Sequence, residues 1–216
     1  MDWQNATAIE SCVMGKSNMY SRENIASLTS PSPTLQRSPE PPKGLAGFSP
    51  FMAEDNMIAL SLWHELGLKH AMTSDVALDF IGSLTIKAYI DRRARWIRVR
   101  KKMTLGATIA EPFTESLVCG LYGSWAISQI IGASRTAIFL IHMALWLMVD
   151  LRVKSSLETN VKNVGPPTST LQFLAAWCAR ELMAFPIWLY AIVGDQVTWR
   201  GNRYRILASG EAVRLA

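Results

Sequence analysis

The clearest membrane-helix signal in this sequence is the nearly uninterrupted apolar run AIFLIHMALWLM at residues 137–148. Two further apolar segments flank it, Leu117 to Ile131 before it and Leu171 to Val193 after it. A helix needs about 20 mainly apolar residues to cross the hydrocarbon core of a bilayer. The sequence therefore predicts a membrane region over residues 105–194 with two to three membrane helices.

Charged residues interrupt the last of these segments. Arg180 and Glu181 lie side by side in it, and Pro186 follows. Charged side chains inside a membrane are costly unless they pair or face a polar cavity. Two interpretations stay open for this pair, namely a contact near a lipid headgroup and an internal ion pair between helices.

The overall composition agrees with a membrane protein. Half of the 216 residues are hydrophobic and 18% are charged, against roughly 25% charged in soluble domains. The net charge is +5, and the basic residues gather at the ends of the apolar segments. This placement favours anionic lipid headgroups, not nucleic acid, as the partner.

Residues 84–104 predict an amphipathic helix lying in the membrane interface. Its expected apolar face is Ile86, Tyr89, Ile90, Ala94, Trp96 and Ile97, and seven basic residues crowd the other side. Arg92 and Arg95 are three residues apart, on one helical face, so two guanidinium groups could clamp a diphosphate. Trp96 could stack on a sugar or a lipid chain. The alternative is a simple anchor of basic and aromatic residues.

The positive-inside rule places this basic helix and the basic residues 200–205 on the same, cytosolic side. Three full crossings would put them on opposite sides. We therefore expect one apolar segment to be re-entrant or interfacial. Thr104 to Ser116 is the candidate, because Glu111, Pro112 and Glu115 interrupt its apolar pattern.

Glu54 to Leu66 predicts a helix with two acidic residues, Glu54 and Asp55, at its start. Adjacent carboxylates can serve as a general base, although acids in the first turn are also common as helix caps. Residues 11–20 and 70–80 predict short strands. The Ser- and Pro-rich residues 29–43 predict a flexible surface insertion.

Five motifs in a fixed order resemble the ceramide glucosyltransferases, with an insertion typical of the fungal branch. They are Cys12-Val13-Met14-Gly15-Lys16-Ser17, Ala53-Glu54-Asp55, Arg92-x-x-Arg95-Trp96, Glu111-Pro112 and Trp199-Arg200-Gly201-Asn202-Arg203-Tyr204-Arg205. The Arg-x-x-Arg-Trp motif alone is shared with cellulose, chitin and hyaluronan synthases. It is the order of all five that makes the resemblance specific.

The resemblance implies an α/β plus membrane α fold. Residues 1–83 would be the C-terminal half of a glycosyltransferase A-type domain, residues 84–104 the interfacial helix, and residues 195–216 a basic cytosolic tail. It implies glucose transfer from UDP-glucose to the primary hydroxyl of ceramide, with inversion, on Golgi or related membranes. Asp55 matches the catalytic base. Donor-diphosphate and acceptor contacts are expected from Glu54, Arg92, Arg95, Trp96, Arg200 and Arg203.

The family also implies a divalent metal, Mg or Mn, held by an Asp-x-Asp pair. No Asp-x-Asp occurs anywhere in this sequence. The expectation is a C-terminal portion of the enzyme that has no transferase activity alone. Two alternatives remain, a non-catalytic membrane protein that binds anionic lipid and a fragment of a processive polysaccharide synthase.

Overall fold

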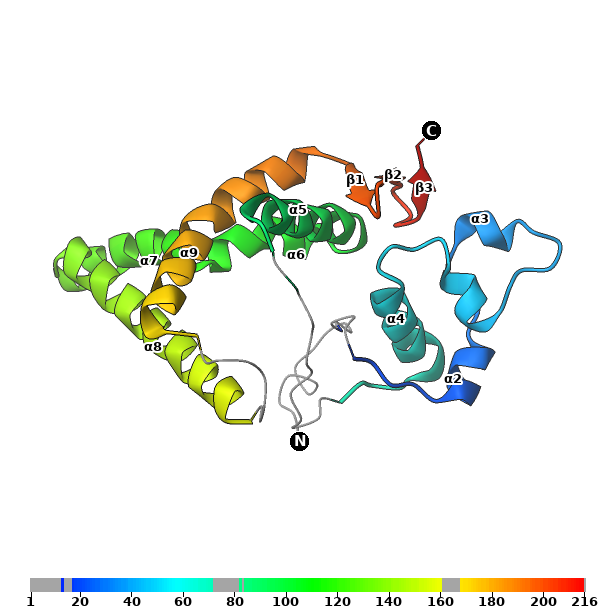
Figure 1. The fold of residues 1–216 in the computed structure, drawn as a ribbon, viewed down its shortest axis with the longest axis horizontal. Coiled ribbons are helices and arrows are strands. Elements are labelled where there is room, and N and C mark those ends of the chain that lie inside the picture. Colours follow the sequence, from blue (N-terminus) through cyan, green and yellow to red (C-terminus); the bar gives the residue numbers. More distant parts are fainter. Residues whose placement is uncertain (1–12, 14–16, 72–81, 83, 161–167, 216) are drawn as a thin grey trace.

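A computed structural model describes residues 13, 17–71, 82, 84–160 and 168–215 (Figure 1). The described residues are mostly helical, with one antiparallel sheet in the order β1-β2-β3. Most residues of the strands predicted at 11–20 and 70–80 lie outside the described ranges, so these strands and the A-type domain stay predictions. The elements are α2 Arg22–Ser27, α3 Pro33–Gln36, the 3-10 helix η1 Gly44–Phe48, α4 Glu54–Leu66, α5 Ile86–Met103, α6 Leu105–Ala110, the 3-10 helix η2 Glu111–Thr114, α7 Ser116–Ile131, α8 Arg135–Asn160, α9 Thr170–Val193, β1 Gln196–Trp199, β2 Asn202–Ile206 and β3 Ala212–Arg214.

Helix α4 has the bounds that the sequence predicts. It begins with Glu54 and Asp55 in the first turn and ends at Gly67, which is left-handed with φ 65°. Glycine adopts this conformation without steric cost, which makes it a common helix stop. The N-cap residue is Ala53, which makes no side-chain cap.

Helix α5 packs along α9. Ala94 and Ile97 on α5 and Ile187 and Ala191 on α9 form one buried cluster. Two residues of the predicted apolar face do not join it, because Ile86 and Trp96 are exposed. Trp96 is adjacent to Ile97 and is therefore turned about 100° away from it around the helix.

Two basic residues of α5 bind the C-terminal end of α9. Arg98 donates to the carbonyls of Gln196, at 2.8 Å, and of Ala191. Lys101 Nζ donates to the carbonyls of Ile192 and Gly194, at 2.6 Å each. The last carbonyls of a helix lack intrahelical partners and carry partial negative charge, so cations stabilise them. A Cβ at Gly194 would lie 2.6 Å from Arg98 Nε, so a larger residue here would displace the Arg98 guanidinium from these carbonyls.

Two described helices, α8 over Arg135–Glu158 and α9 over Thr170–Val193, are long and apolar enough to cross a membrane. Helix α7 has 16 residues, roughly 24 Å at 1.5 Å per residue, which is short of a hydrocarbon core of about 30 Å. It lies against α8 at Gly120, where an added Cβ would lie 2.7 Å from His142 Cδ2. Nothing lies close to the corresponding position at Gly123.

The charged residues within α9 form an internal ion pair. Arg180 Nε donates to Glu181 at 2.7 Å, and Arg180 also meets Asp150 of α8 at 2.7 Å. Glu181 accepts a further hydrogen bond from Ser116, at the start of α7. Of the two interpretations left open by the sequence, the structure supports the internal pair that joins α7, α8 and α9.

Residues 195–216 were expected to be a basic cytosolic tail. The described part of this segment is folded, because β1, β2 and β3 lie in it and form the antiparallel sheet, whose first hairpin pairs Trp199 with Asn202. The two turn residues, Arg200 and Gly201, have φ of 48° and 77°. Positive φ at both central positions is typical of the type I′ turn, which matches the twist of a hairpin. Val197 and Ile206 are buried on the inner face with Val99 of α5.

Residues 29–43 were predicted to be a flexible surface insertion, but they make several specific contacts with the rest of the molecule. Ser30 and Ser32 are buried, and Ser32 caps α3 through a hydrogen bond from the Leu35 amide. Ser32 also donates to Glu211, beside β3. Composition suggested disorder because few apolar residues are present, but here hydroxyl groups bind a buried carboxylate 179 residues away.

In Figure 1 the sheet lies between the two helical parts of the molecule, α2–α4 at one end and α5–α9 at the other. Ala212 of β3 donates its amide to the Pro50 carbonyl at 2.8 Å. Ala53, just before α4, is buried together with Val99, Val197 and Ile206. The C-terminal sheet therefore brings the start of α4 close to α5.

Candidate functional site

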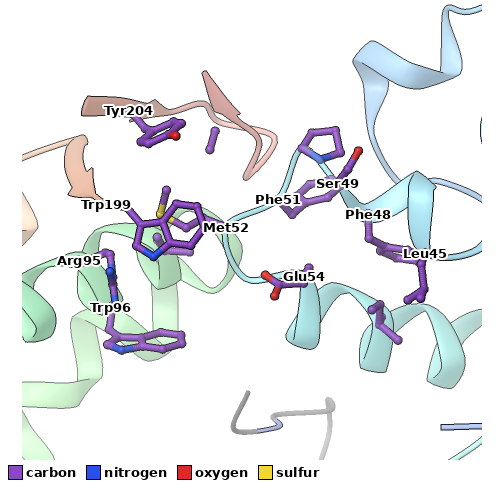
Figure 2. A pocket seen from close by; sticks show the side chains of 14 residues that line it. Leu45, Phe48, Ser49, Phe51, Met52, Glu54, Arg95, Trp96, Trp199 and Tyr204 are labelled. Carbon is purple, nitrogen blue, oxygen red and sulfur yellow. The ribbon is translucent and has the colours of Figure 1, made fainter. Parts of the chain in front are cut away.

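A pocket of about 630 Å³ lies where α4, α5 and the sheet meet (Figure 2). Three of the predicted site residues line it, Glu54 from the start of α4 and Arg95 and Trp96 from α5. The rest of the wall is mainly apolar and comes from η1, the loop before α4, the helices α4 and α5, and the sheet: Leu45, Phe48, Ser49, Pro50, Phe51, Met52, Ile58, Val99, Trp199, Tyr204 and Ala212. The site thus has a few charged groups set in an aromatic and apolar wall.

Arg95 brings positive charge to the α5 side of the pocket. Burial, and then the nearby charge of Arg92, lower the pKa of Arg95 from its ordinary value. Two guanidinium groups placed this close repel each other, and an anion bound between them would relieve that repulsion. Arg95, one of the two arginines predicted to bind a diphosphate, thus lines the pocket, whereas Arg92 is not among the lining residues.

Glu54 and Asp55 do not face the same way. Glu54 lines the pocket and its side chain projects from the first turn of α4 (Figure 2). Asp55 is not among the lining residues, and successive helical residues are turned by about 100°. Its Oδ2 atom is buried without a hydrogen-bond partner among the described residues. An unpaired buried carboxylate oxygen is costly and is not explained by helix capping.

Tyr20 lies near Asp55. Its hydroxyl is also buried, with the Asn18 side chain close to it but no well-aligned hydrogen bond to a described residue. Burial, and then the charge of Asp55, raise the pKa of Tyr20. The hydroxyl therefore keeps its proton at neutral pH and remains a hydrogen-bond donor.

The two arginines predicted from the C-terminal motif lie differently. Arg200, in the hairpin turn, places its guanidinium 4.7 Å from the ring centre of Trp199, which lines the pocket. Arg203 is exposed on β2 and donates to Gln196 at 2.7 Å. It lies beside Tyr204, a pocket residue, and neighbouring strand residues point to opposite faces. Arg203 is thus turned away from the pocket, and the binding roles of both arginines stay predictions.

Ion pairs with the Glu111 carboxylate hold helix α5 in its orientation, on the side of the helix away from the pocket. Glu111 pairs with Arg100, and Arg93 lies 3.8 Å from the same carboxylate. Arg93 also lies 3.6 Å from Glu115. Arg93 and Arg100 are seven residues apart and so share one stripe of the helix. This stripe faces η2, whereas Arg95 and Trp96 face the pocket.

Comparison with known proteins adds the family. Residues 40–212 match glycosyl transferase family 21. The chain belongs to this family. Proteins named ceramide glucosyltransferase are similar to most of it: the one from Candida albicans is 35% identical over 94% of the chain and 44% of its own length, and the one from Komagataella phaffii is 34% identical over 94% and 48%.

A third relative of the same name, from Gibberella zeae, is 36% identical over 90% of the chain and 44% of its own length. The chain therefore spans about half the length of the curated relatives that it matches. No solved structure gives a significant match to it.

Several lining residues of this family 21 site were not predicted. Phe48, Phe51 and Met52 come from a short apolar stretch directly before the acidic pair, which was a usable signal. Trp199 and Tyr204 were quoted in the C-terminal motif, but a tail was expected there. The alternation of Tyr204 and Ile206 along one strand face would have indicated a sheet.

The divalent metal expected for the whole family 21 enzyme has no ligand set in the described part of this chain. No three His, Cys, Asp or Glu side chains gather there. Glu54 is the only carboxylate among the pocket-lining residues. The described residues therefore do not fit a metal, and no step of the reaction is assigned to one below.

Proposed function

We propose that this chain forms the acceptor side of a membrane-bound ceramide glucosyltransferase. The observation that carries the proposal is the pocket itself. It unites Glu54 with Arg95 and Trp96, from separate helices, in an aromatic and apolar wall. An acceptor with a hydroxyl headgroup and apolar chains suits such a wall, and α5, which supplies Arg95 and Trp96, packs along α9, a candidate membrane helix.

The proposed reaction is inverting transfer from UDP-glucose to the primary hydroxyl of ceramide. Asp55 takes the hydroxyl proton, the oxygen attacks the anomeric carbon from one face, and the bond to the diphosphate breaks on the other. Arg92 and Arg95 stabilise the negative charge that develops on the leaving diphosphate. Trp96 and Trp199 hold the acceptor, and Arg200, stacked over Trp199, is proposed to supply further positive charge at the rim. Arg203 is turned away from the pocket and is given no role in this reaction.

The membrane position follows from the two candidate spans. Two crossings, by α8 and α9, return the chain to the side that it left. The basic residues of α5 and of β2 then lie on one side, in agreement with the positive-inside rule. We place the pocket on the cytosolic face of the Golgi or a related membrane, with α6, η2 and α7 at the interface.

The test uses the protein from its complete gene, assayed for glucosylceramide from UDP-glucose and ceramide. Asp55→Asn should lower turnover about 100- to 10,000-fold, the range for loss of a general base. Glu54→Gln is the matched control. It removes the neighbouring carboxylate, and we expect it to change KM more than turnover.

Loss of turnover in Glu54→Gln but not in Asp55→Asn would move the base to the pocket-lining carboxylate. Normal turnover in both variants would show that neither carboxylate at the start of α4 is the base and would overturn the acceptor-side proposal. Absence of product from the unmutated protein would instead favour a non-catalytic, lipid-binding membrane protein. The same assay on the present chain alone should give no product, since the sequence contains no Asp-x-Asp pair.

A further inference from the structure

A second, smaller cavity of about 370 Å³ lies outside the pocket, at the end of α9. It is formed where the end of α5, helix α6, the end of α9 and the turn after β2 meet. Its lining residues are Lys101, Lys102, Leu105, Ile109, Ile192 and Ala208. One side of this groove is cationic and the other is apolar, and the proposed reaction uses none of these residues.

The apolar side continues onto an exposed strip. Leu105 and Ile109 are four residues apart on α6 and therefore share one face. They are 56% and 48% exposed, and Val193 at the end of α9 is 87% exposed. Trp188 Nε1 donates to the Thr108 carbonyl at 2.8 Å, which fixes α6 against α9. The strip thus borders the end of a candidate membrane span.

The cationic side has unused capacity for an anion. Lys101 Nζ makes two hydrogen bonds to carbonyls, and an ammonium group has three donors. Lys102 makes no hydrogen bond or ion pair with any described residue. Asp195 is a nearby acidic residue, and its charge acts on Lys101. Burial, then the charge of Lys102, lower the pKa of Lys101. Two ammonium groups crowded together in this way are stabilised by a bound anion.

We propose that this groove binds one anionic phospholipid, with its phosphate on Lys101 and Lys102 and an acyl chain along Leu105, Ile109 and Ile192. The apolar strip selects a lipid over free phosphate, because free phosphate gains nothing from it. The inference rests on the membrane position proposed for α9 and does not depend on the transfer reaction. The bound lipid would fix the end of α5, and hence the pocket, against the bilayer surface.

Native mass spectrometry tests this on the detergent-purified protein from its complete gene, titrated with phosphatidylserine and with phosphatidylcholine. Lys102→Ala should weaken phosphatidylserine binding about fivefold, because one lysine near an anionic lipid contributes about 1 kcal/mol. Lys102→Arg keeps the charge and should retain binding. Lys43→Ala, an exposed lysine before η1, is the matched control and should change nothing. Leu105→Gln should also weaken binding, because it removes part of the apolar wall.

Equal phosphatidylserine binding by Lys102→Ala and the native protein would overturn the inference. Displacement of the lipid by inorganic phosphate would overturn it as well, because the groove would then recognise phosphate alone. The transfer assay separates this result from the proposed function. Selective lipid binding without glucosylceramide formation would leave the groove intact and refute the enzyme.

Discussion

At the scale of single residues, the most informative atoms are two buried oxygens near the start of α4 that lack well-aligned hydrogen-bond partners. Tyr20 Oη and Asp55 Oδ2 are both enclosed without a hydrogen bond to described residues. Each such atom costs about 1–3 kcal/mol. Proteins seldom retain this cost for packing alone, so a substrate hydroxyl is a natural partner for both groups.

The hydroxyl of Tyr20 can be tested by Tyr20→Phe. We expect glucosylceramide turnover to fall about tenfold, the effect of one hydrogen bond lost from the transition state. The melting temperature should change little, since the hydroxyl makes no well-aligned hydrogen bond to a described residue and only its contact with the Asn18 side chain is lost. Turnover and thermal unfolding are measured on the same preparation. Tyr122→Phe is the control. It removes a hydrogen bond of 3.0 Å to the Phe113 carbonyl, away from the pocket, and unchanged turnover in both variants would contradict a role for Tyr20.

Helix α5 carries three stripes of side chains, and each stripe makes different contacts. Ala94 and Ile97 pack on α9, Arg95 and Trp96 line the pocket, and Arg93 and Arg100 bind Glu111. A small rotation of the helix would move all three stripes together. Glu111 is therefore a positioning residue for the pocket, although it does not touch it.

Glu111→Gln should loosen α5. It leaves Arg100 without its carboxylate, so we expect a stability loss of about 1–2 kcal/mol for this partly exposed pair. KM should rise because Arg95 and Trp96 lose their fixed place. Thermal unfolding and the KM for both substrates are the measurements.

The matched control is Glu115→Gln, on the same side of α5. Burial raises the pKa of Glu115, and the charge of Arg93 offsets this only in part. A carboxyl whose pKa is raised on folding opposes folding once pH exceeds its ordinary value. Because glutamine resembles the protonated form, Glu115→Gln should keep or increase stability at neutral pH. Equal loss in both variants would contradict the special role of Glu111.

The elements that the sequence predicts well are those whose signals are local. Helix α4 follows from apolar spacing, first-turn acids and a glycine stop, and α5 from its two-sided charge pattern. Residues 29–43 were predicted to be a flexible insertion because of their Ser- and Pro-rich composition, and residues 195–216 were expected to be a basic cytosolic tail. Ser32 in the first segment binds Glu211 in the second, 179 residues away. No local pattern can reveal such a contact. The sheet has a local signal in the alternation of Tyr204 and Ile206, but this alternation does not show that the sheet meets α4 and α5 at a pocket.

At the scale of the whole molecule, the C-terminal sheet contacts the segment before α4, and Glu211 makes several of these contacts. It is buried and accepts hydrogen bonds from Ser32, from Ser209 at 2.7 Å and from Thr34 Oγ1 at 3.2 Å. Burial raises the pKa of Glu211, but the hydrogen bonds from Ser32, Ser209 and Thr34 outweigh it, and the pKa is lowered overall. The ionised carboxylate therefore stabilises the fold.

This sets a direction for the pH dependence of stability. A lowered pKa means that the contribution of Glu211 is complete above the ordinary glutamate value, about 4.3, and is lost as pH falls through the folded value. Glu211→Gln should cost about 1–3 kcal/mol at neutral pH. The difference from the native protein should shrink as the pH is lowered from about 7 to about 3. Thermal unfolding of the detergent-purified protein along this pH series measures the difference, with exposed Glu40→Gln as the control.

Because the sheet supplies Trp199 and Tyr204 to the pocket, Glu211→Gln should also weaken substrate binding. A stability difference that persists unchanged at low pH would show that the charge of the Glu211 carboxylate does not stabilise its contacts with Ser32 and Thr34.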